Sequence, residues 1–491
     1  MTITIVGLGP GDPRHLTREA WEVFSSAQEV WLRTTRHPTV AHLPDHLAQH
    51  SFDDLYKSEQ DFASVYRAIT AEVLRLGQRP QGVVYGVPGH PLVGESTVQQ
   101  VLAGAREAGL PVRIVEGLSF VEPTLTALGL DALEPGHGVP GLQVCDGIEL
   151  AARHHPPLNP DLAAIVGQVY SRSLAGDLKL TLMNQYPDEH PVALVHAAGT
   201  ADEQVIRLPL YELDRQAVGH LTSLYIPPLA ATSGFEGLQE TVAHLRAPDG
   251  CPWDRKQTHE SLRGGLLEEA YEAVEAIDAA DLDGLREELG DLLLQIVLHS
   301  QIATEEGEFR MADVIAAIDA KLKRRHPHVW GEQVVNSEQE LLLQWEHLKT
   351  EEKGEGSSLL DGVPKALPAL LQAYTYGERA ARVGFDWPGP AEVAEKVQEE
   401  MAELDAACTP KQVAAELGDL LFAIANWARH LGVDPETALR QANRRFAYRF
   451  RALEDLAHQR GLDLGRMTIE EMDTLWEEVK RITRLFSPLG K

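Results

Sequence analysis

One block of sequence occurs twice in the second half of the chain and constrains its fold more than any other feature. The hexapeptide ELGDLL stands at 288–293 and again at 416–421. Three further blocks recur around it in the same order, which indicates duplication of a whole module. The matched pairs are LLEEAYEAVEA (266–276) with VQEEMAELDAA (397–407), KLKRR (321–325) with RFAYR (445–449), and WEHLK (345–349) with WEEVK (476–480).

The duplicated region reads as helical throughout. Long amphipathic patterns rich in Ala, Leu and Glu fill 231–491, which is typical of an all-α region. Gly, Ser and Pro interrupt them in EEKGEGSSLLDGVP (351–364), which reads as a linker. We therefore predict a first helical domain at 231–352, a linker at 353–364 and a second helical domain at 365–491.

The first 228 residues follow a different pattern. Short β-branched runs alternate with helical stretches such as 17–27 and 96–109, which is typical of an α/β domain. Candidate strands lie at 2–8, 81–86, 112–117, 142–147, 163–169, 178–184 and 192–198. YIPPLA (225–230), with two prolines, suits a domain boundary. The expected fold class is a multidomain chain in which an α/β domain precedes two all-α modules, because 491 residues exceed one hydrophobic core.

Composition excludes several classes of function. The 74 acidic residues outnumber 44 basic ones and give a formal charge of −30, so duplex nucleic acid is not an expected partner. No apolar run approaches the roughly 18 residues that cross a bilayer, so no membrane partner is expected. The three cysteines form no CxxC pair and the N-terminus does not read as a signal peptide, so the expected location is cytoplasmic.

Acidic residues gather at helical spacing in both copies. Residues three or four apart share one face of a helix. The short break at 278–284 predicts an antiparallel hairpin, so acids from two helices can face each other. The first copy carries Glu268, Glu269, Glu272 and Glu275, then Glu288 and Asp291, and the second carries Glu399, Glu400 and Glu403, then Glu416 and Asp419.

Clustered carboxylates repel one another, and a cation would offset that repulsion. Oxygen ligands without Cys or His suit Mg²⁺, or Mn²⁺. The alternative interpretation is a solvated acidic helix face. A cation site is favoured because each ExxD lies within an apolar run and the arrangement occurs twice.

Basic and aromatic residues follow the acidic ones in each copy. Basic pairs four residues apart share a helix face and can meet phosphate oxygens, unless they pair with acids on the same helix. A tryptophan in each WExxK block can stack on a base or belong to the core. These residues are Lys321 and Arg325, Arg445 and Arg449, and the tryptophans Trp345 and Trp476.

These blocks, with CPWDRKQTHESLRGGLLEEAYE (251–272), KLKRRHPHVW (321–330) and VGFDWP (383–388), resemble the MazG family of nucleoside triphosphate pyrophosphohydrolases over about 235–491. The resemblance implies an all-α, Mg²⁺-dependent enzyme that converts nucleoside triphosphates to monophosphates and pyrophosphate. Because the family is built from helical dimers, we expect a homodimer or a higher homo-oligomer.

The resemblance also assigns roles to individual residues. The implied metal ligands are Glu400, Glu403, Glu416 and Asp419, with Glu269, Glu272, Glu288 and Asp291 in the first copy. The implied nucleotide contacts are Lys396, Arg445, Arg449 and Trp476, with Lys321 and Arg325 in the first copy. Glu399 and Glu268 are candidates to orient or deprotonate water. The copies differ where Gly265 stands in the place of Lys396.

The N-terminal part resembles the tetrapyrrole (corrin/porphyrin) methylase superfamily, as in fusions of the YabN type. The motifs are IVGLGPGDP (5–13), VYGVPGHPLVGESTV (84–98), VEGLSFVEPTLTALGLD (115–131) and VHAAGT (195–200). The resemblance implies loops that hold S-adenosylmethionine, where glycine lets the backbone approach a cofactor. The residues it assigns are Gly9, Gly11, Asp12, Pro88, Gly89, His90, Ser119, Phe120, Gly199 and Thr200.

Two sequence features of the N-terminal part limit which cofactor and which reaction can be expected of it. Asp12 and Pro13 follow the glycines where a dinucleotide-binding loop would run into its helix. AQEVWLRTTRH (27–37) lacks the acid that many superfamily methylases carry after the first helix, which leaves methylation of a tetrapyrrole open. The runner-up is a tetrapyrrole methyltransferase with a regulatory or dimerising helical half. A scaffold without chemistry is the third alternative, and the complete acid sets argue against it.

Overall fold

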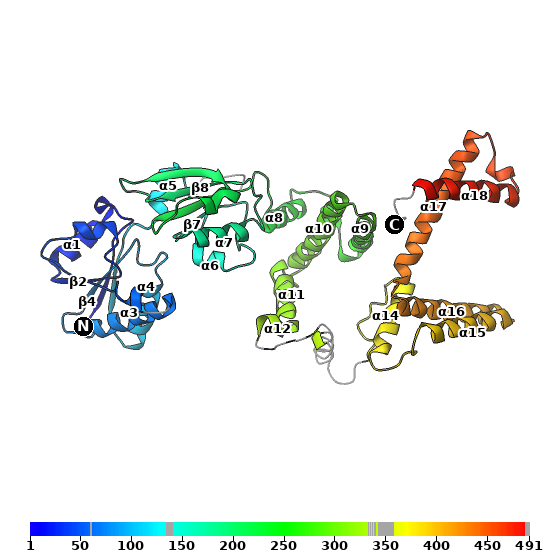
Figure 1. Cartoon of the computed structure of the whole chain (residues 1–491), viewed down its shortest axis with the longest axis horizontal. Helices are drawn as coiled ribbons and strands as arrows, with labels where there is room; N and C mark the ends of the chain where they lie inside the picture. Colours follow the sequence, from blue (N-terminus) through cyan, green and yellow to red (C-terminus); the bar gives the residue numbers. More distant parts are fainter. Residues whose placement is uncertain are drawn as a thin grey trace. The chain divides into compact units, whose positions relative to one another are not determined.

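The computed structural model describes residues 1–58, 61–133, 141–331 and 358–486, together with 333, 335, 337, 340 and 341 (Figure 1). The chain divides into two compact units, Met1–Asp319 and Ala320–Lys491. The WEHLK block, with Trp345, and the predicted boundary at 352/353 lie outside the described residues. None of the helices within the described ranges is both long and apolar enough to cross a bilayer.

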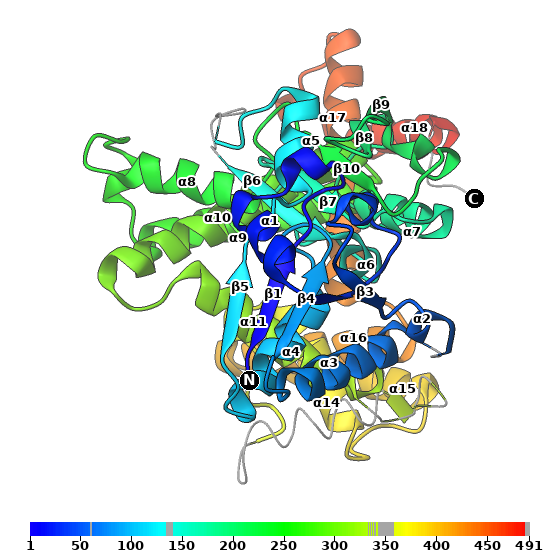
Figure 2. The same ribbon diagram turned by 90° about the vertical axis from the view of Figure 1, so that its left-hand side faces the viewer.

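A five-stranded parallel sheet with strand order β3-β2-β4-β1-β5 opens the first unit. Its strands are β1 (Ile3–Gly7), β2 (Glu29–Leu32), β3 (Ala48–Ser51), β4 (Val83–Val87) and β5 (Val112–Val115). Helices α3 (Phe62–Gly77) and α4 (Ser96–Glu107) cover one face (Figure 2), and α1 (Arg18–Ser26) covers the other. Burial on both faces explains why these strands are nearly continuous apolar runs.

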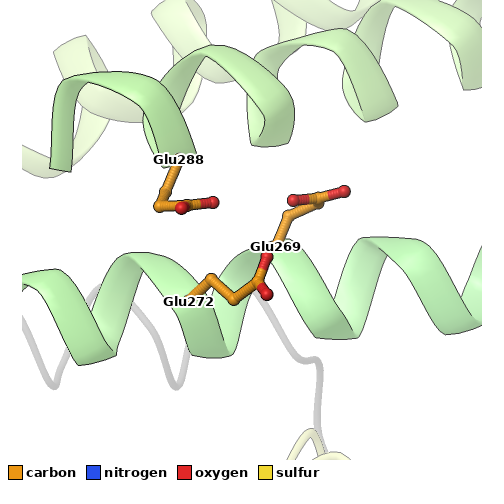
Figure 3. Close-up of side chains that lie close together, drawn as sticks. All are labelled: Glu269, Glu272 and Glu288. Atoms are coloured by element: carbon orange, nitrogen blue, oxygen red, sulfur yellow. The ribbon is translucent and has the colours of Figure 1, made fainter. Parts of the chain in front are cut away.

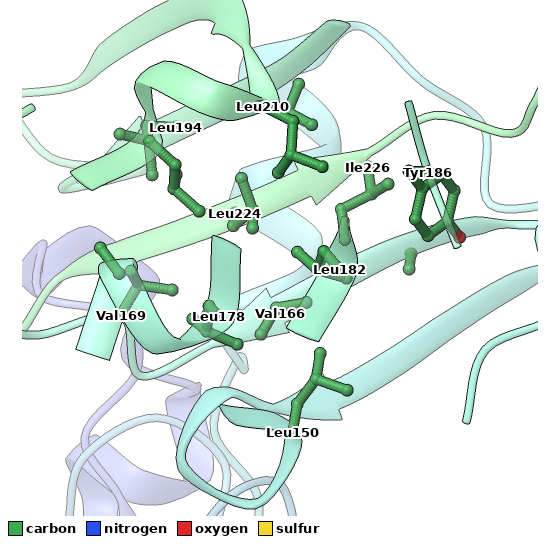
Figure 4. Close-up of a cluster of buried hydrophobic side chains, with 14 of the residues drawn as sticks. Leu150, Val166, Val169, Leu178, Leu182, Tyr186, Leu194, Leu210, Leu224 and Ile226 are labelled. Carbon is green, nitrogen blue, oxygen red and sulfur yellow. The ribbon is translucent and has the colours of Figure 1, made fainter. Parts of the chain in front are cut away.

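A second five-stranded sheet, of order β6-β7-β10-β8-β9, follows in the same unit. Its strands are β6 (Leu142–Asp146), β7 (Ala163–Gly167), β8 (Pro191–His196), β9 (Gln204–Pro209) and β10 (Thr222–Ile226). Only β6 and β7 run parallel. Its core gathers Val166, Leu178, Leu182 and Leu224, all buried (Figure 4). The α/β part also contains the helices α2 (Leu55–Ser58), α5 (Val121–Leu128), α6 (Gly147–Ala151) and α7 (Arg172–Leu182), and short 3₁₀ turns at Pro13–His15, Pro38–His42 and Leu210–Arg215.

One predicted strand is wrong: residues 178–184 belong mostly to helix α7 and the turn after it. Leu174, Leu178 and Leu182 recur every four residues and are buried, which is the period of a helix face. Leu180 gives the segment its strand-like alternation, but its side chain is exposed. The remaining predicted strands correspond to β1 and β4–β8. Strands β2, β3, β9 and β10 escaped prediction because each carries polar residues that interrupt its apolar run.

The helical part of the first unit begins directly after the second sheet. The buried Asp161 carboxylate accepts hydrogen bonds from the backbone N–H groups of Ser233 and Gly234, at 2.7 and 3.0 Å. These bonds anchor the start of helix α8 (Phe235–Arg246) on the α/β part. A 3₁₀ turn, Asp254–Lys256, then leads to helix α9 (His259–Ala279) and helix α10 (Leu282–Glu306).

The predicted break between the two acidic helices is confirmed but is shorter than the expected 278–284, because α9 ends at Ala279 and α10 begins at Leu282. Ala280, after the end of α9, adopts a left-handed conformation with φ of 53°. The Asp281 side chain then accepts from the Gly284 N–H at 3.0 Å and caps the start of α10. The two helices pack along each other as the expected hairpin (Figure 1).

Helix α11 (Met311–Arg325) runs from the first unit into the second, whose described part is helical. Its helices are α12 (Pro327–Trp330), α14 (Ala369–Ala381), α15 (Pro390–Ala406), α16 (Pro410–His430), α17 (Pro435–Gln459) and α18 (Ile469–Phe486), with a 3₁₀ turn at Leu464–Arg466. Thr409 and Gln412 form a capping box at the start of α16, which packs along α15 as a second hairpin. α17 packs on α18 through a small core that includes Leu453 and Leu475.

Candidate functional site

Three carboxylates converge in the first hairpin. Glu269 and Glu272 project from α9, and Glu288 projects toward them from α10 (Figure 3). One carboxylate oxygen of each lies within 4.8 Å of the other two. The spacing of three residues puts both α9 acids on one stripe, and the antiparallel hairpin places α10 opposite that stripe.

The second hairpin repeats this arrangement. Glu400 and Glu403 on α15 and Glu416 on α16 bring their carboxylate oxygens within 4.8 Å of one another. The fourth predicted ligand of each copy, Asp291 or Asp419, is not part of the group at this distance. Both nevertheless lie near enough to act electrostatically on their neighbours, so the sequence spacing placed all four acids in one region.

Burial and mutual repulsion raise the pKa values of two carboxylates in the first cluster. Burial raises the pKa of Glu288, and Glu272 and Asp291 raise it further. Burial also raises the pKa of Glu269, with Asp291 adding to the effect. These two directions show carboxylates held closer together than water-exposed acids prefer.

The second cluster shows the same effect and adds a positive charge. Burial raises the pKa of Glu416, followed by repulsion from Glu403 and Asp419, and Lys396 opposes the shift. The ammonium of Lys396 lies 2.7 Å from Glu400 and 3.1 Å from Glu399. Hydrogen bonds to Glu400 and Glu399 in turn raise the pKa of Lys396. Lys396 therefore contacts the predicted ligand set directly.

The residues present fit a divalent cation. Glu400 is only 6% exposed, and its Oε2 has no hydrogen-bond partner. In the first copy Gln295 is 9% exposed beside Glu269, and its Oε1 also lacks a partner. Buried oxygens without partners are costly unless something satisfies them. Oxygen donors alone, without His or Cys, match the preference of Mg²⁺ or Mn²⁺.

The other residues assigned from the resemblance are not members of the two carboxylate groups. Arg445 and Arg449 stand on α17, while Trp476 stands on α18, half-buried, with its ring centroid 5.4 Å from that of Phe446. None of these three residues belongs to the carboxylate group of the second hairpin, and their nucleotide contacts stay predictions. Lys321 and Arg325 lie on α11 beyond Asp319, in the second compact unit, and their role stays a prediction as well. Glu268, a candidate for orienting water, is exposed on α9.

In the α/β part, the glycine loops meet at the carboxyl end of the parallel strands. Gly9 and Gly89 exchange backbone hydrogen bonds of 3.2 and 2.9 Å. Both have left-handed φ angles, 71° and 65°, which glycine adopts without steric cost. A Cβ at Gly11 would lie 3.0 Å from the Thr200 side chain, so the first loop also touches the loop after β8.

A cleft of about 480 Å³ opens beside these loops, between the two sheets. Of the ten residues assigned to cofactor binding, the cleft is lined by Gly9, Pro88, Gly89 and Phe120. The other six, Gly11, Asp12, His90, Ser119, Gly199 and Thr200, do not line it. Several of them shape the loops: Asp12 caps the turn at Pro13–His15, and the Ser119 hydroxyl donates to Glu122 at 2.6 Å.

The most distinctive group in the cleft was not predicted. Arg33 donates to the buried Glu95 carboxylate at 2.5 Å, to Tyr56 OH at 3.1 Å and to Tyr66 OH at 3.3 Å. Burial alone would lower the pKa of Arg33, but Glu95 raises it above its ordinary value, so the arginine stays protonated. Arg33 follows β2 at the edge where parallel strands end, so recognising 29–32 as a strand would have indicated it.

Fold and site together define a chain of two kinds of domain: a methylase-type α/β domain and helical hairpins that carry paired carboxylate clusters. The MazG nucleotide pyrophosphohydrolase domain matches residues 257–330, and the phosphoribosyl-ATP pyrophosphohydrolase model matches 375–446. The tetrapyrrole (corrin/porphyrin) methylase model matches residues 2–214. Both copies of the repeat are thus matched by pyrophosphohydrolase models.

The chain belongs to the MazG family, in the form that carries an N-terminal tetrapyrrole methylase domain. It is 41% identical over 498 residues to the uncharacterized protein YabN of Bacillus subtilis, covering 98% of this chain and 99% of that one. It is 49% identical over 247 residues to the nucleoside triphosphate pyrophosphohydrolase/pyrophosphatase MazG of Thermotoga maritima, which covers 50% of this chain and 95% of that protein. The nucleoside triphosphate pyrophosphohydrolase of Escherichia coli K12 is 45% identical over 255 residues, with coverages of 50% and 97%.

Among solved structures, the chain is similar to a uroporphyrin-III C-methyltransferase from Thermus thermophilus, with a TM-score of 0.36 and 25% identity. That match covers 46% of this chain and 91% of the other. A second structure of the Thermus thermophilus enzyme, complexed with S-adenosyl homocysteine, has a TM-score of 0.34 and 20% identity over 46% of this chain and 97% of that one.

Proposed function

We propose that the helical modules hydrolyse nucleoside triphosphates to monophosphates and pyrophosphate in the presence of Mg²⁺, and so remove unwanted nucleotides from the cellular pool. The observation that carries this proposal is the carboxylate cluster that recurs in two hairpins, Glu269, Glu272 and Glu288 in one and Glu400, Glu403 and Glu416 in the other. It occurs in a chain whose helical half is 49% identical to a curated triphosphate pyrophosphohydrolase.

Each group of residues has a distinct task in this proposal. A bound divalent cation would neutralise phosphate oxygens and so make the phosphorus easier to attack. The clustered carboxylates, with Asp291 or Asp419 beside them, would hold that cation between the two helices. Lys396, Arg445 and Arg449 would bind phosphate oxygens and stabilise the charge on the departing pyrophosphate.

The remaining assigned residues would act on water and base. Glu399 in the second copy, and Glu268 in the first, would orient the attacking water or accept its proton. Trp476 would stack on the base, which tolerates any base because every base has a π-face. Lys321 and Arg325 would take the phosphate-binding role in the first copy.

The products and the cation dependence test this function together. We expect the full-length protein to release pyrophosphate from nucleoside triphosphates when Mg²⁺ is present, and to stop when the cation is chelated with EDTA. A panel of ordinary and damaged triphosphates, assayed for pyrophosphate and orthophosphate separately, provides the measurement. Release of orthophosphate instead of pyrophosphate, or activity that EDTA leaves unchanged, would contradict the proposal.

We also propose that the cleft of the α/β part binds S-adenosylmethionine. The methylase model that matches residues 2–214 supports this, as does a cleft of about 480 Å³, which lies within the range typical of single drug-sized ligands. The runner-up function, a tetrapyrrole methyltransferase with a regulatory helical half, shares this cofactor. Under this alternative, however, the carboxylate clusters would have no catalytic role.

Calorimetry with S-adenosylmethionine tests the cofactor proposal. We expect binding by the full-length protein and a loss of at least about tenfold in affinity for Gly89→Val, whose side chain would enter the cleft and strain a left-handed residue. Gly109→Val is the matched control, because Gly109 has the same φ of 65° but does not line the cleft. Absence of binding heat from the unaltered protein would rule out the cofactor.

We propose, finally, that the helical modules pair in a homodimer or a higher homo-oligomer. Exposed apolar residues form the same stripe on both hairpins: Leu289, Leu293 and Ile296 on α10, and their equivalents Leu417, Leu421 and Ile424 on α16. A stripe at helical spacing is what a second helical module would cover. Sedimentation of the full-length protein measures the assembly.

A further inference from the structure

We infer that the two carboxylate clusters bind divalent cations with different affinities, because two positions beside the carboxylates carry different residues in the two copies. Aligning the ELGDLL blocks and the acidic blocks before them pairs Gly265 with Lys396 and Gln295 with Ala423. The first copy therefore carries glycine and glutamine where the second carries lysine and alanine. This inference rests on the proposed cation-dependent function and adds to it a difference in cation affinity between the two clusters.

In the first cluster, a neutral amide fills the space. A Cβ at Gly265 would lie 3.0 Å from Nε2 of Gln295, so the glutamine occupies the room that a larger residue at 265 would need. The Gln295 amide hydrogen bonds to the Glu269 carboxylate. Its Oε1, buried and without a partner, adds a further oxygen near the carboxylates.

In the second cluster, a cation that belongs to the chain fills the equivalent space. Lys396 reaches Glu400 at 2.7 Å and Glu399 at 3.1 Å. On the opposite helix the residue equivalent to Gln295 is Ala423, which is buried and small. In contrast, no ion pair among the described residues involves Glu269, Glu272 or Glu288.

The second cluster carries one more positive charge than the first, because Lys396 stands where the first copy has Gly265. Both clusters bring together three carboxylates, but the second has one of them partly neutralised by an ammonium group. A unit charge at a few ångströms changes the affinity for a divalent cation by about tenfold or more, even in a partly hydrated and screened site. Without nucleotide, the first cluster therefore binds Mg²⁺ or Mn²⁺ more tightly than the second.

Nucleotide reverses part of this difference. A triphosphate offers Lys396 phosphate oxygens in place of Glu400, which frees that carboxylate for the cation. Cation and triphosphate then strengthen each other's binding at the second cluster, because coupling between two ligands is reciprocal. The first cluster binds its cation tightly without nucleotide, whereas the second binds its cation more weakly until the triphosphate is present.

Titration of the full-length protein with Mn²⁺, followed through the electron paramagnetic resonance signal of free Mn²⁺, measures this difference directly. Without nucleotide we expect two classes of site that differ by about tenfold in affinity. Glu272→Gln with Glu288→Gln should remove the tight class, and Glu403→Gln with Glu416→Gln the weak one. The same acid-deficient variants identify which hairpin each class belongs to.

Exchange variants test the cause. Gly265→Lys with Gln295→Ala should weaken the tight class about tenfold, and Lys396→Gly with Ala423→Gln should tighten the weak class by a similar factor. Gly264→Lys is the matched control, because it adds the same charge at an exposed neighbour of Gly265 with open space around it. Two exchanges in opposite directions distinguish a charge effect from damage to the fold, since damage weakens binding in both.

The outcomes separate the inference from the function beneath it. Two classes of equal affinity, each removed by its own acid variants, would overturn the inference and leave the cation-dependent function standing. So would exchange variants that bind Mn²⁺ as the unaltered protein does. Mn²⁺ binding that neither set of acid variants reduces would overturn the proposed function itself.

Discussion

Removing carboxylates from both hairpins should lower the rate of pyrophosphate release by about a thousandfold or more. The variant combines Glu272→Gln and Glu288→Gln with Glu403→Gln and Glu416→Gln. Glutamine keeps the shape of each side chain but removes two charges from each cluster, which then holds a divalent cation poorly. Each tenfold loss corresponds to about 1.4 kcal/mol of transition-state stabilisation, and loss of a bound cation removes several kcal/mol.

Changing one hairpin at a time shows which copy turns over. If both are active, each double variant retains part of the activity, and only the combined variant loses nearly all of it. Glu395→Gln with Asp405→Asn is the control, because both acids are exposed on α15 and neither belongs to the cluster. A combined variant that keeps more than about a tenth of the activity would contradict the assigned role of the clusters.

Removing one partner of the Arg33–Glu95 pair should destabilise the α/β part by about 3–5 kcal/mol. Glu95→Ala leaves a guanidinium that is only 18% exposed without its carboxylate, and the hydrogen bonds to Tyr56 and Tyr66 do not replace that charge. A guanidinium keeps its proton at neutral pH even without a partner, so the arginine does not escape the cost by losing that proton. Hydrogen exchange of peptides from β1 and β4, within the full-length protein, measures the loss locally.

The double variant Arg33→Met with Glu95→Leu should recover most of that stability. Replacing a buried ion pair with apolar side chains of similar volume is often neutral, whereas breaking it is not. Glu22→Ala provides the control, because its pairing with Arg18 is largely exposed and is worth less than about 1 kcal/mol. A Glu95→Ala protein as stable as the parent, or a double variant as unstable as the single one, would contradict this account of the pair.

The acidic clusters were predictable because their geometry is local. Spacings of three and four residues fix which side chains share a helix face, and a short break fixes the hairpin. Glu269, Glu272 and Glu288 therefore meet as expected, as do their counterparts in the second copy. The sequence could not place Asp291 as exactly, because the offset between two packed helices depends on side-chain packing along their whole contact.

The α/β cleft was less predictable because it depends on long-range order. The glycine motifs correctly indicated loops, yet Gly11 and Gly199 shape neighbouring backbone and do not line the cleft. Arg33 and Glu95 are 62 residues apart and meet only because β2 and β4 are neighbours in the sheet. Since β2 carries only four residues, its strand pattern is too short to stand out from the sequence.

Residues 178–184 were predicted as a strand because the residues that define their helix lie outside the segment. Its alternating leucines resemble a strand, but the helix period is set by Leu174 and by the Ser171 cap, both before the segment. Trp476 shows a comparable limit. Its WExxK motif left open whether the ring stacks on a base or belongs to the core, and its packing against Phe446 belongs to contacts between α17 and α18 that no local pattern specifies.

Crystals of the full-length protein grown with Mn²⁺ test the central claim most directly, because manganese scatters anomalously and marks its own position. The account predicts an anomalous peak in each hairpin, within about 2.5 Å of carboxylate oxygens. The oxygens belong to Glu269, Glu272 and Glu288 in one hairpin, and to Glu400, Glu403 and Glu416 in the other. Carboxylates turned outward to water in both hairpins, with no peak between the helices, would contradict it.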